Sequence, residues 1–117
     1  MTAVFVDARN VLRSQWPNLP EEELVERARA WAARHGRSIV LVFDGKAPGS
    51  LVGVQELDEG TTLVGCGGES ADDWLIREVP RHSGAWLVTS DRALRAAAGG
   101  QTARVIGGGS FLRQLDD

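Results

Sequence analysis

The sequence predicts an α/β fold, a three-layer α/β/α sandwich around a central parallel sheet. Short apolar runs at residues 4–6, 39–43 and 86–89 are rich in β-branched and aromatic side chains, which is typical of strands buried on both faces. Segments with helical spacing separate these runs, and such alternation favours parallel strands joined by helices. Each run is followed closely by an aspartate, namely Asp7, Asp44 or Asp91.

The elements follow in order from local signals. Pro20 and the glutamates after it start the second helix, and Gly36 ends it. Gly99 and Gly100 end the fourth helix. Strands are expected at residues 3–6, 38–43, 62–65, 85–89 and 103–106, and helices at residues 8–15, 21–35, 71–79, 92–98 and 110–115.

Two glycine-rich segments are expected to be irregular. Residues 45–61 contain repeated glycine and proline and predict a loop, in which residues 51–54 form either a short extra strand or part of a cover over the site. Residues 107–109 are all glycine and predict a flexible connection, with Ser110 capping the last helix.

Right-handed crossovers place the five strands, numbered along the chain, in the order 3-2-1-4-5. The order reverses between the first and fourth strands, which end near Asp7 and Asp91. In open α/β sheets the binding crevice lies at such a switch point, beyond the carboxyl ends of the strands. The sequence therefore predicts a site between these two aspartates.

Size and composition describe one ordinary globular domain over residues 1–117, with 43% hydrophobic and 25% charged residues. No apolar stretch approaches the ~20 residues that span a bilayer, and no signal peptide precedes the first strand. Cys66 is the only cysteine, so no disulfide can form within the chain. We expect a cytoplasmic protein with no membrane association. The sequence does not determine the oligomeric state.

A group of carboxylates is expected at the carboxyl edge of the sheet. Two carboxylates ~5 Å apart repel by about 3 kcal/mol at an effective dielectric constant near 20. A larger group would cost much of the ~5–15 kcal/mol of net stability unless a cation offsets the repulsion. Mg²⁺ or Mn²⁺ suits such oxygen ligands and would activate a phosphate for attack by water. The members are Asp7, Asp44, Asp72, Asp73 and Asp91.

Each of these acids also has a structural explanation. Asp7 and Asp91 are in position to cap the helices that follow them. Asp44 precedes a glycine, as in an ordinary turn. Ser70 and Asp73 fit a capping box. The functional explanation is favoured because the acids converge on one edge.

Polar and basic residues beside the acids are candidates for contact with a phosphate. Asn10 lies one helical turn after Asp7, where its amide would hold that carboxylate or touch the phosphate, unless it is merely solvated. An arginine fork suits phosphate, although the net charge of −3 gives no broad nucleic-acid footprint. The substrate-binding candidates are Arg9, Lys46, Thr89, Ser90 and Arg92.

Four short motifs together resemble the NYN branch of the PIN-like nucleases, and most closely its YacP-like group. They are Asp7-x-x-Asn10, Val42-Phe43-Asp44-Gly45, Glu69-Ser70-Ala71-Asp72-Asp73 and Val88-Thr89-Ser90-Asp91-Arg92. The resemblance implies a PIN-like fold that cleaves RNA with Mg²⁺ or Mn²⁺. It implies single-stranded RNA or mRNA as substrate, in some relatives on the ribosome.

By motif match, Asp7, Asp72 and Asp91 would form the catalytic, metal-binding core. Asn10, Asp44 and Asp73 would support it. The chain has Asp7-Ala8-Arg9-Asn10 where the family usually has Asp-Gly-Tyr-Asn, and Arg95 where some relatives carry a further acid.

The main hypothesis is therefore a metal-dependent endoribonuclease. The alternative is a catalytically weak or inactive RNA-binding or scaffolding module with the same fold. A phosphatase or phosphotransfer domain has little support, because strand 103–106 ends in Ile106-Gly107 without the lysine that phosphotransfer receivers carry there.

Overall fold

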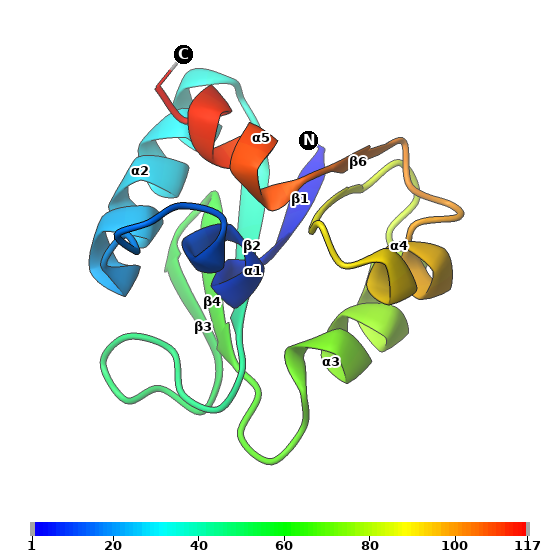
Figure 1. Cartoon of the computed structure of the whole chain (residues 1–117), viewed down its shortest axis with the longest axis horizontal. Coiled ribbons are helices and arrows are strands. Elements are labelled where there is room, and N and C mark those ends of the chain that lie inside the picture. Colours follow the sequence, from blue (N-terminus) through cyan, green and yellow to red (C-terminus); the bar gives the residue numbers. More distant parts are fainter. Residues whose placement is uncertain (1, 117) are drawn as a thin grey trace.

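A six-stranded sheet forms the middle layer of the computed structural model, which describes residues 2–116 (Figure 1). The order is β3-β4-β2-β1-β5-β6, and every neighbouring pair is parallel except β3 and β4. Without β3, the order agrees with the predicted 3-2-1-4-5. The strands are β1 (Ala3–Asp7), β2 (Ser38–Phe43), β3 (Gly53–Asp58), β4 (Thr61–Gly65), β5 (Trp86–Val88) and β6 (Arg104–Ile106).

Helices cover both faces of the sheet, and alternate residues of each strand point to opposite layers. Val4 and Val6 belong to one core with α1 (Ala8–Arg13), α2 (Glu21–Arg34) and α5 (Gly108–Gln114). Phe5 belongs to the other core, formed with α3 (Ala71–Glu78) and α4 (Arg92–Ala98). A short 3-10 turn, Val79–Arg81, follows α3. This confirms the predicted three layers. No helix in the described part of the chain is long and apolar enough to cross a membrane.

Of the two alternatives for residues 51–54, the extra strand is closer to the structure, because β3 begins at Gly53 and extends to Asp58. The expectation of a loop over residues 45–61 is therefore wrong for the residues of β3. This strand pairs antiparallel with β4, with Val54 opposite Val64. Nearly all of β3 is exposed, so it lacks the apolar run that marks the buried strands. It adds an antiparallel edge to a sheet that was predicted to be entirely parallel.

The expectation of a flexible connection at residues 107–109 is also wrong. The last helix begins at Gly108, with Gly107 as its N-cap, rather than after Ser110. A Cβ at position 108 would lie only 2.7 Å from Asn10 Oδ1, so glycine allows α5 to approach α1 closely. These glycines therefore reflect packing rather than flexibility.

Gly65→Ala should lower the free energy of unfolding by about 2–3 kcal/mol through overpacking. A Cβ there would lie 2.0 Å from Leu51 O and 2.9 Å from Ala47 N, which are backbone atoms of the 45–52 loop. Those atoms are hydrogen-bonded to each other at 2.9 Å, so the loop must shift. Urea denaturation measures the loss. Gly68→Ala is the control, because a Cβ there meets open space, and equal stability of the two variants would contradict the prediction.

Candidate active site

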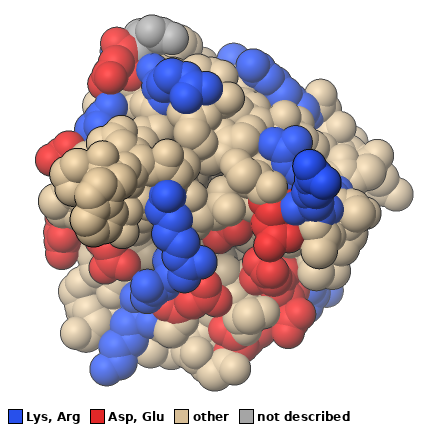
Figure 2. Space-filling view, in the orientation of Figure 1, with Lys and Arg blue, Asp and Glu red and all other residues tan. Residues whose placement is uncertain are grey.

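Acidic side chains from both halves of the chain meet at the carboxyl edge of the sheet. Asp7 is the last residue of β1, Asp44 follows β2, and Asp91 follows β5. The first turn of α3 adds Asp72 and Asp73. Figure 2 shows acidic surface gathered in the middle of this face, with basic surface on both sides of it.

Asp7 is the most deeply buried of these acids, with only 6% of its surface exposed. It occupies the N-cap position of α1, but its side chain makes no capping hydrogen bond. Its Oδ2 instead accepts a hydrogen bond of 3.0 Å from Thr89 Oγ1. The backbone N–H of Asn10 nevertheless lowers the pKa of Asp7, so the carboxylate interacts with the start of α1 although it does not cap the helix with a hydrogen bond.

The surroundings of Asp7 disfavour its charged form. The pKa of Asp7 is raised to about 6, first by burial and then by the negative charges of Asp72 and Asp44. The hydrogen bond from Thr89 acts in the opposite direction. An acid that is costly to ionise, next to other acids, is typical of a functional site.

Asp72 connects the other members electrostatically. Burial is again the first cause of its raised pKa, followed by the charges of Asp91, Asp44 and Asp73. Asp72 is half-buried, whereas Asp73 is exposed. Asp72 thus lies within electrostatic range of Asp7, Asp44, Asp73 and Asp91, and Asp7 lies within range of Asp44.

Asp44 and Asp91 have structural roles as well. Asp44 Oδ1 accepts a 2.8 Å hydrogen bond from Ala71 N, which ties the end of β2 to the start of α3. Asp91 Oδ1 accepts one of 2.9 Å from Leu94 N and caps α4, as its structural explanation predicted. Ser70 Oγ caps α3 by accepting from Asp73 N. Asp44 and Asp91 each use only one carboxylate oxygen in these hydrogen bonds.

No basic side chain neutralises this group. Within residues 2–116, none of the five aspartates forms an ion pair with lysine, arginine or histidine. The nearby Arg9 guanidinium donates to the backbone oxygen of Asp44 at 3.3 Å, not to its carboxylate. Glu69 is different, because Arg77 pairs with it. The aspartates therefore form an uncompensated anionic group, which a cation would stabilise.

The carboxylate oxygens of these aspartates suit a hard divalent ion that binds only some of the aspartates directly. Among residues 2–116, no three acidic, histidine or cysteine side chains are close enough together to hold one ion between them. Mg²⁺ commonly keeps several waters and binds proteins through only one or two carboxylates, together with substrate phosphates. The aspartates offer only oxygen ligands, and their charge is not paired with a basic side chain within residues 2–116, so they suit such an ion.

The predicted polar residues organise the segment that carries Asp91. Asn10 Oδ1 accepts a 2.8 Å hydrogen bond from Ser90 N, rather than binding the Asp7 carboxylate. Ser90 Oγ accepts from Gly108 N at 2.9 Å, and Thr89 Oγ1 accepts from Asp91 N at 3.2 Å. Asn10, Thr89 and Ser90 thereby connect β5 to α1 and α5.

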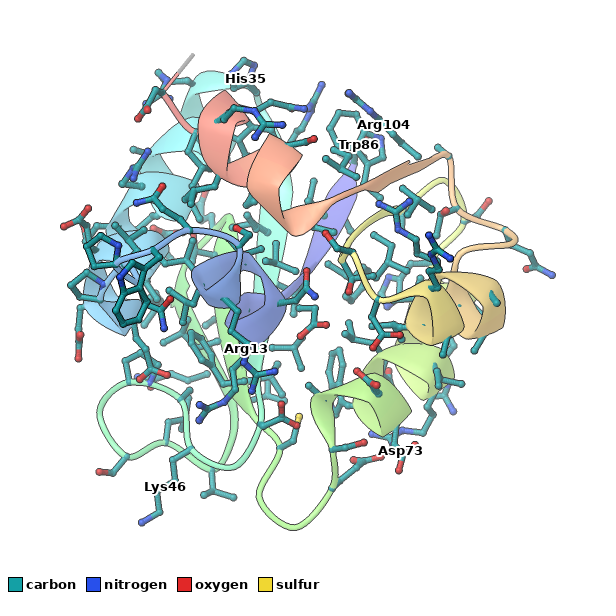
Figure 3. All side chains as sticks on the ribbon, in the orientation of Figure 1. Arg13, His35, Lys46, Asp73, Trp86 and Arg104 are labelled. Carbon is teal, nitrogen blue, oxygen red and sulfur yellow. The ribbon has the colours of Figure 1, made fainter. Side chains whose placement is uncertain are left out.

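The basic candidates lie around the acids and not among them. Lys46 and Arg92 are exposed, on the loop after β2 and in the first turn of α4, respectively. In Figure 3, Lys46 and Asp73 lie on opposite sides of Arg13, which projects from α1. Arg9 is half-buried, and its Nε is buried without a hydrogen-bond partner.

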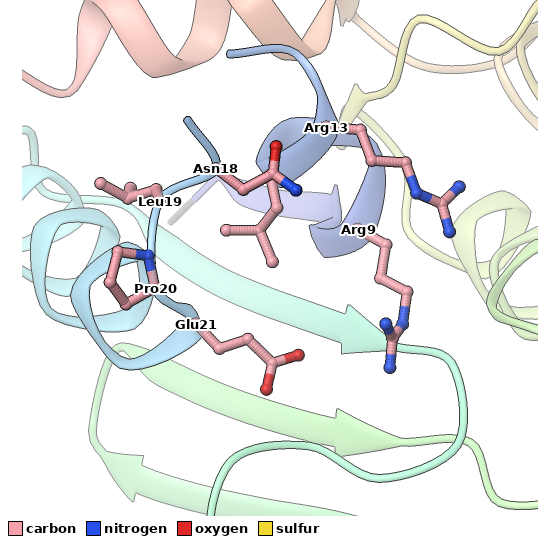
Figure 4. A pocket seen from close by; sticks show the side chains of 7 residues that line it. Arg9, Arg13, Asn18, Leu19, Pro20 and Glu21 are labelled. Carbon is pink, nitrogen blue, oxygen red and sulfur yellow. The ribbon is translucent and has the colours of Figure 1, made fainter. Parts of the chain in front are cut away.

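A cavity of about 470 Å³ opens beside α1 and was not foreseen from the sequence. Arg9, Leu12 and Arg13 of α1 form one wall, and residues 18–21 form the other (Figure 4). Its walls come from segments that only the turn between α1 and α2 brings together. The only sequence signal was the i, i+4 spacing of the two arginines.

Comparison with known proteins places this geometry in a family. The family model of the YacP-like NYN domain matches residues 4–117. Two crystal structures of Rae1 (YacP) from Bacillus subtilis have similar folds, at 18% sequence identity in both cases. The W164L mutant has a TM-score of 0.74, with 99% of this chain and 76% of the other covered. The second structure has a TM-score of 0.73, with 99% and 74% covered.

A search of curated proteins gave no significant match. The family model nevertheless covers nearly the whole chain, and its members are nuclease-like. This agrees with the YacP-like resemblance of the four sequence motifs. The chain belongs to the YacP-like NYN domain family.

Proposed function

We propose that this protein is a metal-dependent endoribonuclease that hydrolyses phosphodiester bonds at the acidic edge of its sheet. One observation carries the proposal: aspartates from three strand ends and one helix start converge there without an ion pair among the described residues. The nuclease-like family supports it. The substrate is single-stranded RNA, with mRNA or ribosome-bound mRNA in the cytoplasm as the physiological form.

Asp7, Asp72 and Asp91 would surround Mg²⁺ or Mn²⁺, with one or two of them as direct ligands and the remaining carboxylates, including Asp44 and Asp73, acting through water. A bound divalent ion would supply positive charge for the phosphate and acidify water. Thr89 fixes Asp7 at the end of β1 and the α4 cap fixes Asp91 after β5, so both carboxylates would be held in place to receive the ion.

Basic and polar groups at the rim bind the RNA chain. Arg9, Lys46 and Arg92 offset phosphate charge, with arginine forks matching the phosphate oxygens. Ser90 would donate to the phosphate, and Asn10 keeps its segment in place through Ser90 N. The buried Thr89 hydroxyl already donates to Asp7 and accepts from Asp91 N, so Thr89 holds these two acids instead. Together they would align the scissile bond with the acidic group.

The test is cleavage of fluorescently labelled single-stranded RNA with Mn²⁺ or with EDTA. Wild type should cut only with Mn²⁺. Asp91→Asn, purified in the same way, should lose at least about 100-fold in rate, because Asn keeps the α4 cap but removes a charge from the metal site. Equal cleavage by both proteins, or no cleavage of any RNA, would refute the proposal.

The alternative is an RNA-binding module without catalysis. One observation supports it: among residues 2–116, no three candidate metal ligands are close enough to hold one ion between them. Thermal unfolding separates the two functions. A nuclease of the proposed kind should show an increase in Tm with Mn²⁺, because an ion that binds only the folded state stabilises it. A pure RNA binder should bind RNA with no such increase.

A further inference from the structure

We infer that the cavity between α1 and residues 18–21 is a subsite for one nucleotide of RNA next to the scissile phosphate. This inference rests on the proposed function, because it assigns a ligand to the region beside the same acidic edge. Its volume, about 470 Å³, lies within the usual range of ~300–1,000 Å³ for small-ligand sites. It is therefore large enough for a nucleotide.

None of the five aspartates lines the cavity, but Arg9 in its wall links it to the acidic group. Asp7 ends β1 and α1 starts at the next residue, so Arg9 lies only two positions from the most buried acid. Arg9 also donates to the backbone oxygen of Asp44, on the other side of the acidic group. An RNA strand with one phosphate at the acids would place its neighbouring nucleotide here.

The α1 wall provides cationic donors. Arg9 and Arg13 are four residues apart and therefore share one face of the helix, and Figure 4 shows both side chains reaching along the same side of the cavity. In the described part of the chain neither forms an ion pair with a carboxylate. The Arg9 Nε is buried and has no hydrogen-bond partner among the described residues, whereas the Arg13 side chain is exposed. Arg13 is therefore the donor most open to a phosphate in the cavity.

The opposite wall suits a base. Leu19 and Pro20 offer apolar surface, and Glu21 extends from the start of α2 toward the arginine side (Figure 4). A carboxylate repels phosphate but accepts a hydrogen bond from the amino group of a base such as cytosine. The nucleotide therefore lies with its phosphate at Arg9 and Arg13 and its base beside Glu21.

Binding is measured by fluorescence anisotropy of labelled ten-nucleotide RNAs in EDTA, so that cleavage plays no part. Arg13→Gln should raise Kd by at least about fivefold and reduce the slope of log K against log salt by about 0.7, as expected for one lost single-strand phosphate contact. Arg81→Gln is the matched control. It removes the same charge from an exposed residue after α3 and should change Kd less than about twofold.

A second variant tests whether the base of the nucleotide lies beside Glu21. Wild type should bind oligocytidylate more tightly than oligouridylate, and Glu21→Ala should remove that preference because it leaves no side-chain acceptor at this position. If Glu21→Ala instead tightened both RNAs equally, Glu21 would face a phosphate and the assigned orientation would be wrong.

The two proposals fail in different ways. If Arg13→Gln behaved like Arg81→Gln in EDTA while wild type still cut RNA with Mn²⁺, the subsite would be refuted and the nuclease function retained. If Arg13→Gln weakened binding but no RNA were cut, the subsite would stand and the catalytic proposal would fail.

Discussion

Replacing Asp72 with asparagine should lower the rate of Mn²⁺-dependent RNA cleavage by about 100- to 1,000-fold, the cost of losing a preorganised charge at a reaction centre. Asp72 is half-buried and interacts electrostatically with Asp7, Asp44 and Asp91. Its neighbour Asp73 is exposed and affects the group only through Asp72. Asp73→Asn should therefore reduce the rate by less than about tenfold, as expected for an outer ligand bound through water.

These two variants form a matched pair. Both remove one carboxylate from the first turn of α3, where an acid gains ~0.3–1 kcal/mol from the helix dipole. The Ser70 cap remains in both, because it uses the backbone N–H of residue 73 and not the side chain. A difference in activity therefore cannot come from the stability of the helix.

Single-turnover cleavage at saturating Mn²⁺, with circular dichroism to verify folding, measures both rates. Equal losses in the two variants would show that the reaction responds to charge near α3 in general. Retained activity in Asp72→Asn would remove this residue from the metal site and leave Asp7 and Asp91 to hold the ion.

The sequence was sufficient to predict the strands whose burial on both faces requires a run of apolar residues. β1 and β2 are buried on both faces, and their apolar runs predicted both strands and the aspartates at their ends. The predicted reversal of strand order between β1 and β5 is also present, and the aspartates gather at the edge that it marks. Each of these inferences needs only local composition and a general rule of chain topology.

The sequence was insufficient where one residue's role depends on a distant partner. Asn10 was expected to bind Asp7 or a phosphate, but its partner is Ser90 N, eighty positions away. The glycine at position 108 looked like a flexible linker, yet it provides space for that same Asn10 side chain. Such roles depend on packing between α1 and α5, which no local pattern encodes.

Asp7→Asn should make the metal-free protein more stable and weaken its response to metal. Asparagine keeps an oxygen that can accept from Thr89 Oγ1, and it removes the charge that burial, Asp72 and Asp44 disfavour. With a pKa of about 6 in the folded state against 3.8 for the free side chain, ionised Asp7 costs roughly 2–3 kcal/mol of folding free energy. For a protein of this size, that corresponds to an increase in Tm of roughly 10 °C.

The sign of the pH dependence follows from linkage. Because the folded state binds the Asp7 proton more tightly, the contribution of Asp7 to wild-type stability falls as pH rises from about 4 to 6. Above that window the cost is fully present, and well below pH 3.8 Asp7 is protonated in both states. The stability gain of Asp7→Asn should therefore be small at pH 4 and reach its full size above pH 7.

Asp58→Asn is a control for surface charge. Asp58 is exposed, and hydrogen bonds from Gly60 N and Arg29 lower its pKa, so neutralising it should not stabilise the protein at any pH. Urea denaturation from pH 4 to 8, with and without Mn²⁺, gives the comparison. The ion should stabilise wild type more than Asp7→Asn, because it offsets the repulsion that the variant has already removed. A loss of apo stability in Asp7→Asn would mean that its carboxylate holds the fold together, and Asp7 would then no longer be expected to bind the ion.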